Sequence, residues 1–241
     1  MSSADRRGGR GRPGLAPHQL LVAWQTAALL LNYPDEKLLD QTPLLRSASG
    51  RLPAGTGQPI RNVLDHLEST PLPQLQTDYV DTFDTRRRSN LFLTYFAHGD
   101  TRKRGMALLR FKQTYLASGV VLDDTELPDH LCVVLEFAAT VDQRRGRDLL
   151  LEHRAGLELL RLSLRDARSA WVGVLDAVSS TLPPLRGDER EAVARLAAEG
   201  PPEEEVGLSP FAAPQFSPGA PAASPSSTVL LPTPSFPGVR A

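Results

Sequence analysis

The sequence YVDTFDTRRRSNLFLTYFAHGDTRKRGMALLRFKQTYLASG at residues 79–119, followed by ELPDHLCVVLEF at residues 126–137, decides the fold class. Apolar and aromatic residues recur here at helical spacing, as at Leu108, Phe111 and Tyr115. No short window alternates between apolar and polar residues and is also bounded by hairpin turns, as a strand would be. The stretch therefore predicts successive amphipathic helices and an all-α fold.

The flanking sequence has the same periodicity on both sides. Further apolar faces complete a set of predicted helices at residues 18–31, 35–48, 58–68, 72–83, 89–98, 101–118, 128–141, 146–164, 169–181 and 188–198. Pro43 is expected to kink or break its helix, because proline lacks the N–H that an interior position donates. Residues 50–57 are expected to form a loop.

Composition divides the chain into three parts. Residues 1–16 form an arm rich in glycine and arginine, which we expect to be disordered. Residues 17–199 are predicted to fold as a single helical-bundle domain. Of 21 prolines, ten lie between Pro201 and Pro237. A proline-, serine- and alanine-rich tail at 200–241 cannot bury enough apolar area to offset its chain entropy, so it too is expected to be disordered.

Charge and cysteine content limit the function classes. With a formal net charge of −1, the chain as a whole is not attracted electrostatically to nucleic acid or to an anionic membrane. The single cysteine, Cys132, excludes an internal disulfide, and its apolar surroundings favour a buried structural role in a reducing compartment. The arginines of the arm precede an apolar run, as in a secretion signal. That run is interrupted by polar residues and is shorter than the roughly 20 residues of a membrane span, so no membrane insertion is expected.

The sequence has no arrangement typical of catalysis or of a bound cofactor. The histidines His18, His66, His98 and His153 are scattered over different predicted helices, and no metal-ligand spacing appears. There is no phosphate-binding glycine loop and no nucleophile beside a base. We therefore predict a protein that is not an enzyme and that has no permanently bound cofactor or metal.

Basic residues are concentrated in one region. Between Arg86 and Lys112 there are eight basic residues and one acidic residue, Asp100. Three interpretations remain open: a solvated face paired with nearby aspartates, a surface for an acidic or polar peptide, and a nucleic-acid surface that stacks bases on interleaved aromatic residues. The low net charge and the burial expected of Phe92, Tyr95 and Phe96 weaken the third.

Glu126, Asp129 and His130 place carboxylates beside an imidazole. Catalysis is disfavoured because no third group stands at a recognisable spacing. Asp129 in the first turn of a helix would interact favourably with the helix dipole. One interpretation of these residues is therefore that they start a helix. The alternative is that they form a polar contact point in a peptide-binding groove.

The order and spacing of several blocks resemble the NarJ family, the assembly chaperones of respiratory nitrate reductase. This family is part of the all-helical redox-enzyme maturation chaperones related to TorD and DmsD. The likeness covers roughly residues 20–184 and rests on Tyr79–Asp84, Arg87–Arg88, Leu93–Tyr95, Gly99–Gly105, Phe111–Lys112 and Glu126–Leu131. The arm and the tail depart from the family.

The resemblance implies a cytoplasmic chaperone that binds the N-terminal region of the apo catalytic (alpha) subunit. It would hold that subunit until molybdopterin guanine dinucleotide is inserted and prevent premature docking on the membrane partner. It would also assist the insertion of an iron–sulfur cluster. Molybdenum cofactor biosynthesis proteins are further expected partners. The alternative function is a helical nucleic-acid-binding or regulatory protein that uses residues 86–112.

The resemblance also implies a client-binding surface around a Pro-Asp-His element, with a second region near residues 95–104. The candidate residues are Phe83, Tyr95, Asp100, Arg102, Arg104, Glu126, Leu127, Pro128, Asp129 and His130. We expect an apolar groove with a basic, histidine-bearing rim, into which a client helix inserts its apolar side chains. Protonation of His130 on that rim is hypothesised to tune the affinity.

Overall fold

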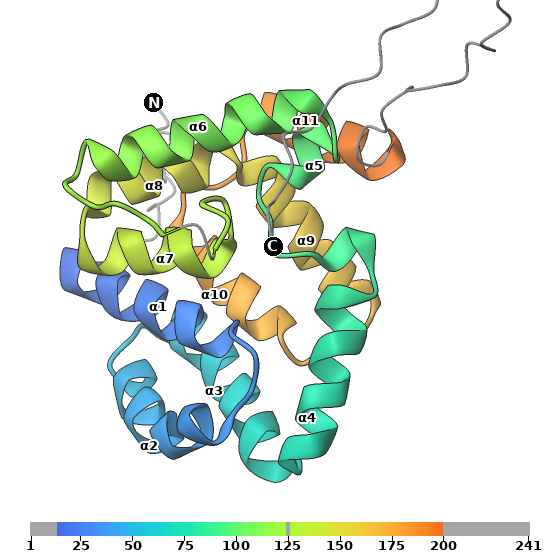
Figure 1. Cartoon of the computed structure of the whole chain (residues 1–241). Helices are drawn as coiled ribbons and strands as arrows, with labels where there is room; N and C mark the ends of the chain where they lie inside the picture. Colours follow the sequence, from blue (N-terminus) through green and yellow to red (C-terminus); the bar gives the residue numbers. More distant parts are fainter. Residues whose placement is uncertain (1–13, 124–125, 200–241) are drawn as a thin grey trace, which may run out of the picture. The chain divides into compact units, whose positions relative to one another are not determined.

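The computed structural model describes residues 14–123 and 126–199, and these form helices joined by short links (Figure 1). The all-α prediction is confirmed, since the one β-type pairing in these ranges is an isolated bridge between Phe92 and His130. The helices of two turns or more are α1 (Pro17–Leu30), α2 (Glu36–Gly50), α3 (Ala54–Ser69), α4 (Leu72–Tyr79), α6 (Arg102–Leu116), α7 (Leu131–Thr140), α8 (Gln143–Glu152), α9 (Arg154–Asp166), α10 (Val172–Thr181) and α11 (Gly187–Glu199). The shorter elements are a π-helical turn at Val80–Asp84, a 3₁₀ turn at Arg87–Ser89, and α5 (Tyr95–His98).

Every described residue belongs to one compact unit of the chain. Except for residues 14–16, the predicted arm and tail lie outside the described residues. None of the described helices has the length and apolar character needed to cross a bilayer.

α1 packs against α7, α10 and α2, and Figure 1 shows it between α7 and α2. Its alanines at 23, 27 and 28 are buried and allow neighbouring helices to approach closely. Trp24 is fully buried, and its indole N–H donates to Thr181 Oγ1 at 2.9 Å on α10. The predicted inner face of this helix is confirmed by this burial. An apolar helix face is stable in water only when other elements cover it.

Glycines allow two further close approaches. A Cβ at Gly146 in α8 would come within 2.5 Å of Ala138 Cα in α7, and closer still to its Cβ. A Cβ at Gly173 in α10 would lie 2.5 Å from the Pro59 carbonyl oxygen in α3. In both places the backbones are too close to accommodate a larger residue.

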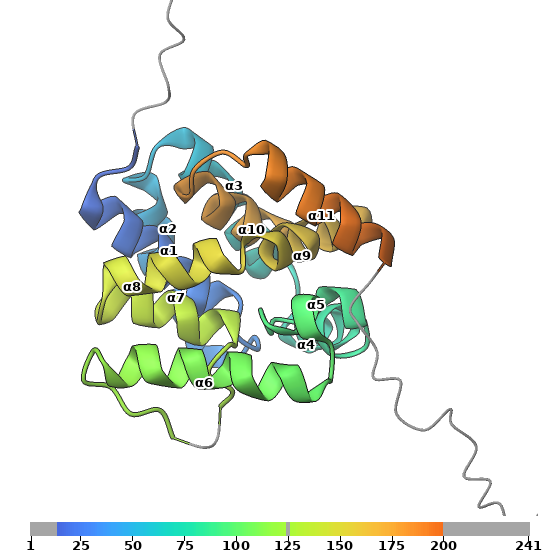
Figure 2. The same cartoon turned by 90° about the horizontal axis from the view of Figure 1, so that it is seen from above.

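α9 lies between α10 and α11, and Figure 2 shows α11 running along it. α11 packs on α9 and buries Val193. Buried charges occur here as well. Arg154 Nη2 lies 2.8 Å from Glu158 Oε1, and both side chains are almost inaccessible.

Several predicted boundaries were wrong. The loop expected at residues 50–57 is mostly helical, because α3 begins at Ala54. α2 is not broken at Pro43, which lies inside the helix. The helix expected at 146–164 is divided at His153 into α8 and α9. The helix expected at 89–98 is reduced to α5, which ends where Gly99 adopts a positive φ of 56°.

Candidate functional site

The Pro-Asp-His element forms a turn and does not begin a helix. The N–H of His130 donates to the carbonyl of Leu127 at 3.1 Å, and α7 starts one residue later. Our prediction that Pro128 and Asp129 occupy the first helical turn was therefore wrong. The reason is a competing pairing: Leu93 N–H donates to the Asp129 carbonyl, and Leu131 N–H donates to the Leu91 carbonyl.

The side chain of Asp129 is fully buried beneath this turn. Its Oδ2 accepts from the backbone N–H of Thr94 at 3.1 Å and from the Thr94 hydroxyl at 2.5 Å. Arg104 Nη2 lies 3.9 Å from the same oxygen. Asp129 Oδ1 and Arg104 Nη2 have no hydrogen-bond partner among the described residues. Asp129 therefore connects the turn to the segment before α5.

Arg104, in the first turn of α6, completes this cluster. It donates to Asp100 Oδ1 at 2.9 Å and, through Nε, to Thr94 Oγ1 at 3.3 Å. Its guanidinium lies 5.4 Å from the ring centroid of Phe92 and 6.0 Å from that of Tyr95, within reach of a cation–π contact. Four of the predicted residues thus come together, and Thr94, which the sequence did not single out, joins them.

α6 also supports the turn through Tyr115. The Tyr115 hydroxyl donates to the Pro128 carbonyl at 2.6 Å, and its ring lies 4.6 Å from that of Phe137. Burial raises the pKa of Tyr115, so this hydroxyl remains a donor over the whole physiological range. The backbone of the turn is therefore held from both sides.

A hollow of about 320 Å³ opens beside the turn. Its lining comes from the segment after α1, the segment before α5, the turn with the residue before it, and α7; the residues are Asn32, Phe92, Glu126, Leu127, His130, Cys132, Val133 and Glu136. The His130 ring stands edge-on to Phe92 with 5.2 Å between centroids. Cys132 is buried, as predicted, and burial raises the pKa of its thiol. Sequence reasoning missed five of the lining residues, namely Asn32, Phe92, Cys132, Val133 and Glu136.

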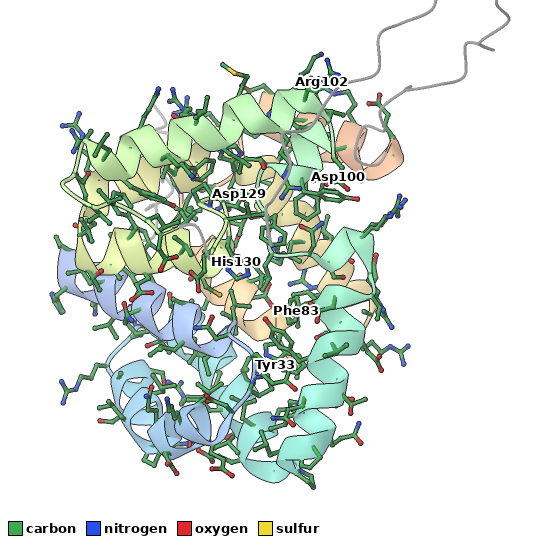
Figure 3. All side chains as sticks on the ribbon, viewed as in Figure 1. Tyr33, Phe83, Asp100, Arg102, Asp129 and His130 are labelled. Atoms are coloured by element: carbon green, nitrogen blue, oxygen red, sulfur yellow. The ribbon has the colours of Figure 1, made fainter. Side chains whose placement is uncertain are left out.

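Of the candidate residues, Glu126, Leu127 and His130 line this hollow, whereas Phe83 and Arg102 belong neither to the hollow nor to the cluster around Asp129. Phe83 is buried among Tyr79 and Trp171, with ring centroids 4.7 Å and 5.7 Å away, and so belongs to the core. Arg102 is exposed at the start of α6. In Figure 3, Arg102 lies above His130 at the top of the view, and Phe83 lies below it.

The basic residues do not form one continuous face. Arg104 is bound to Asp100, and Arg110 forms a bidentate pair with Glu152 on α8. A second hollow, of about 560 Å³, has a lining of apolar and charged residues, namely Arg86, Arg88, Phe96, Leu159, Leu162, Ser163, Asp166, Ala167, Leu196 and Ala197. This distribution gives little support to a nucleic-acid groove.

Two half-buried histidines make the stability depend on pH. Burial lowers the pKa of His130 and of His153, whose ring lies 4.9 Å from Phe111. The unfolded chain then binds more protons than the folded chain just below the ordinary histidine pKa of about 6.5. We therefore expect the melting temperature to fall as the pH drops through and below that value, as followed by circular dichroism.

The double variant His130→Gln/His153→Gln should show a shallower dependence over the same range. Replacing the exposed His18 by Gln is the control and should keep the wild-type slope. Equal slopes for the double variant and the wild type would contradict this origin of the pH effect. Within residues 14–123 and 126–199, no group of three or more metal-ligating side chains is placed to hold a metal ion.

Comparison with known proteins identifies relatives of this chain. A family model described as nitrate reductase delta subunit matches residues 49–177. The chain is 42% identical over 161 residues to the nitrate reductase-like protein NarX of Mycobacterium tuberculosis, covering 66% of this chain but only 24% of that protein. It is 32% identical over 165 residues to NarJ of Bacillus subtilis, covering 67% of this chain and 88% of that protein.

NarJ of Escherichia coli, named a nitrate reductase molybdenum cofactor assembly chaperone, is 31% identical over 150 residues, which cover 61% of this chain and 64% of NarJ. Among solved structures, one described as a redox enzyme maturation protein from Archaeoglobus fulgidus has a similar fold. The TM-score is 0.50 at 20% identity, and the match covers 71% of this chain and 96% of that one.

Proposed function

Because this chain belongs to the family of nitrate reductase delta subunits, we propose that it is an assembly chaperone for respiratory nitrate reductase. It binds the N-terminal region of the apo catalytic subunit. It holds that subunit in a state open to insertion of molybdopterin guanine dinucleotide and keeps it from docking early on its membrane partner. The chaperone also assists the insertion of an iron–sulfur cluster into the client. The chaperone works in the cytoplasm and catalyses no reaction itself.

The observation that supports this function most is the hollow beside the Pro128–His130 turn. Phe92, Leu127 and Val133 contribute apolar surface to it, and Leu127 is 42% exposed at its edge. The turn is fixed by Thr94 and Tyr115 before any partner arrives. A pre-organised site that combines apolar and polar side chains suits an amphipathic helix, with little ordering cost on the chaperone side.

The affinity must allow release once the client is complete. A dissociation constant near 1 μM, or about −8 kcal/mol, meets that need better than picomolar binding. We expect a peptide from the client N-terminal region to bind the full chain saturably by isothermal titration calorimetry. Absence of any signal at about 100 μM, far above this dissociation constant, would refute the proposed function.

Leu127→Ser is expected to weaken that binding about tenfold, corresponding to the loss of ~1.4 kcal/mol of apolar contact. Leu44→Ser is a matched control, because Leu44 is 69% exposed on α2 and contributes nothing to the hollow. Titration calorimetry on both variants, after their melting temperatures are compared, measures the difference. If both variants bind like the wild type, the client does not use this hollow.

A further inference from the structure

α6 has two apolar faces, and only one of them is covered. Phe111 and Tyr115 are buried against the domain, whereas Met106, Leu109 and Leu116 are 70%, 47% and 64% exposed. At about 100° per residue, these last three side chains lie within an arc of about 80°, on the side of the helix away from Phe111 and Tyr115. We call them the outer stripe.

The outer stripe differs from the usual scatter of single apolar residues on a protein surface. Among the helices of residues 14–123 and 126–199, no other helix carries more than one exposed large apolar side chain. Figures 1 and 2 both show α6 at the edge of the helical domain. A single helix at an edge presents a ridge, which can enter a soft surface along its whole length.

The charges of α6 are all positive. Its sequence, RKRGMALLRFKQTYL, contains five basic residues and no acidic one. The helical arrangement places Lys112 beside one edge of the outer stripe, Lys103 beside the other and Arg102 at its start, and all three are exposed. The charge of Arg110 is offset by its pair with Glu152 on α8. The outer stripe is therefore apolar along its centre and flanked by cations on both sides.

We propose that the outer stripe binds the surface of an anionic lipid membrane, with α6 lying in the plane of the interface. Met106, Leu109 and Leu116 enter the boundary between headgroups and acyl chains, while Lys103 and Lys112 reach the headgroups with their long side chains. This is adsorption to one leaflet and requires no membrane span. The proposal goes beyond the chaperone function and does not depend on it.

Charge favours a lipid surface over a second copy of this chain. Two outer stripes that faced each other would bring their flanking cations together, whereas anionic headgroups attract each cation near the surface. The net charge of −1 for the whole chain does not prevent this contact. At physiological salt, exposed charges act over only about 8 Å, so the face that meets the membrane determines the attraction.

The test mixes the full chain, without a client, with vesicles and measures the bound protein by sedimentation. Vesicles of equal parts phosphatidylglycerol and phosphatidylcholine should bind the chain saturably, and about tenfold or more tightly than phosphatidylcholine alone. Met106→Ser/Leu109→Ser should weaken this binding about tenfold or more. Leu44→Ser/Val141→Ser is the matched control, since it changes exposed apolar residues outside α6 and should bind like the wild type.

A second pair of variants tests the charges. Lys103→Gln/Lys112→Gln should weaken binding to the anionic vesicles about tenfold at low salt and much less at high salt. Lys37→Gln/Arg195→Gln removes the same charge from exposed positions on α2 and α11 and should bind like the wild type.

Tryptophan fluorescence locates the contact directly. Trp24 and Trp171 are buried, so a tryptophan introduced by Leu109→Trp is the one that lipid can reach. Brominated lipids in the anionic vesicles should quench it, and should leave the fluorescence of Leu44→Trp unchanged.

Failure of the wild type to bind the anionic vesicles would overturn the inference, leave the chaperone proposal intact and point to an acidic groove of a protein partner as the occupant of this face. Equal binding to both kinds of vesicle would also overturn it. So would equal weakening by the outer-stripe pair and its control.

Discussion

Replacing Gly146 by valine is expected to lower the free energy of unfolding by about 3 kcal/mol or more, because the new side chain would overlap the backbone of α7. A Cβ at this position already lies within 2.5 Å of Ala138 Cα. The neighbouring atoms belong to a helix and not to a flexible side chain, so relaxation requires α7 and α8 to separate. That separation would disturb the contact of α7 with α1. For a domain of this size the melting temperature should fall by roughly 6–12 °C.

Gly105→Ala is the matched control for this experiment. Gly105 lies in α6, and a Cβ there meets nothing within 4 Å. Alanine should therefore stabilise the protein by about 0.5–1 kcal/mol, because it lowers the entropy of the unfolded chain without a clash. Urea unfolding monitored by circular dichroism compares the variants. Effects of the same sign and size would show that the close contact of α7 and α8 does not limit stability.

Asp129→Ala is expected to cost about 3 kcal/mol and to abolish client binding. The change leaves the Thr94 N–H and hydroxyl without their acceptor and removes the buried charge that faces Arg104. Loss of one partner from a buried charged network is costly, because the remaining groups stay desolvated. The segment before α5 would separate from the turn, and Phe92 would leave the wall of the hollow.

Two variants separate charge from shape at this position. Asp129→Asn keeps an acceptor for Thr94 and should cost clearly less than alanine. Asp100→Asn removes the other carboxylate bound to Arg104, but that side chain is 78% exposed, so the loss should stay below about 1 kcal/mol. Chemical unfolding and peptide titration of all three variants test this order. An Asp100 variant as damaging as Asp129→Ala would contradict a role centred on the buried carboxylate.

The helices with long apolar faces could be predicted from sequence, because periodicity over three or more turns leaves few alternatives. α1 is the clearest case, since the predicted inner face around Trp24 and Ala27 is buried. Residues 89–98 could not be predicted in the same way. Leu91 and Leu93 are buried on either side of the half-buried Phe92, a period of two that is too short to distinguish from a helix beforehand.

The site was predictable only in part. The Pro-Asp-His element was found through its resemblance to a known family, but its surroundings were not. Nothing in the sequence links Asp129 to Thr94, because their contact depends on how two distant segments pair. Glu136 was not among the candidate residues, because only the packing of α7 beside the turn places it in the lining of the hollow. Likewise, only tertiary packing accounts for the buried pair of Arg154 and Glu158.

The bridge between Phe92 and His130 joins the two ends of the segment that contains α5 and α6. α6 contributes little to the interior, with Phe111 and Tyr115 as its buried residues, while Met106 and Leu116 face outward. Separating α5 and α6 from the rest of the domain should therefore need less free energy than unfolding the helices beneath them. The pairing of Phe92 with His130 would keep the two ends of this segment together while it is open. Closing it again would therefore carry no new loop-closure entropy.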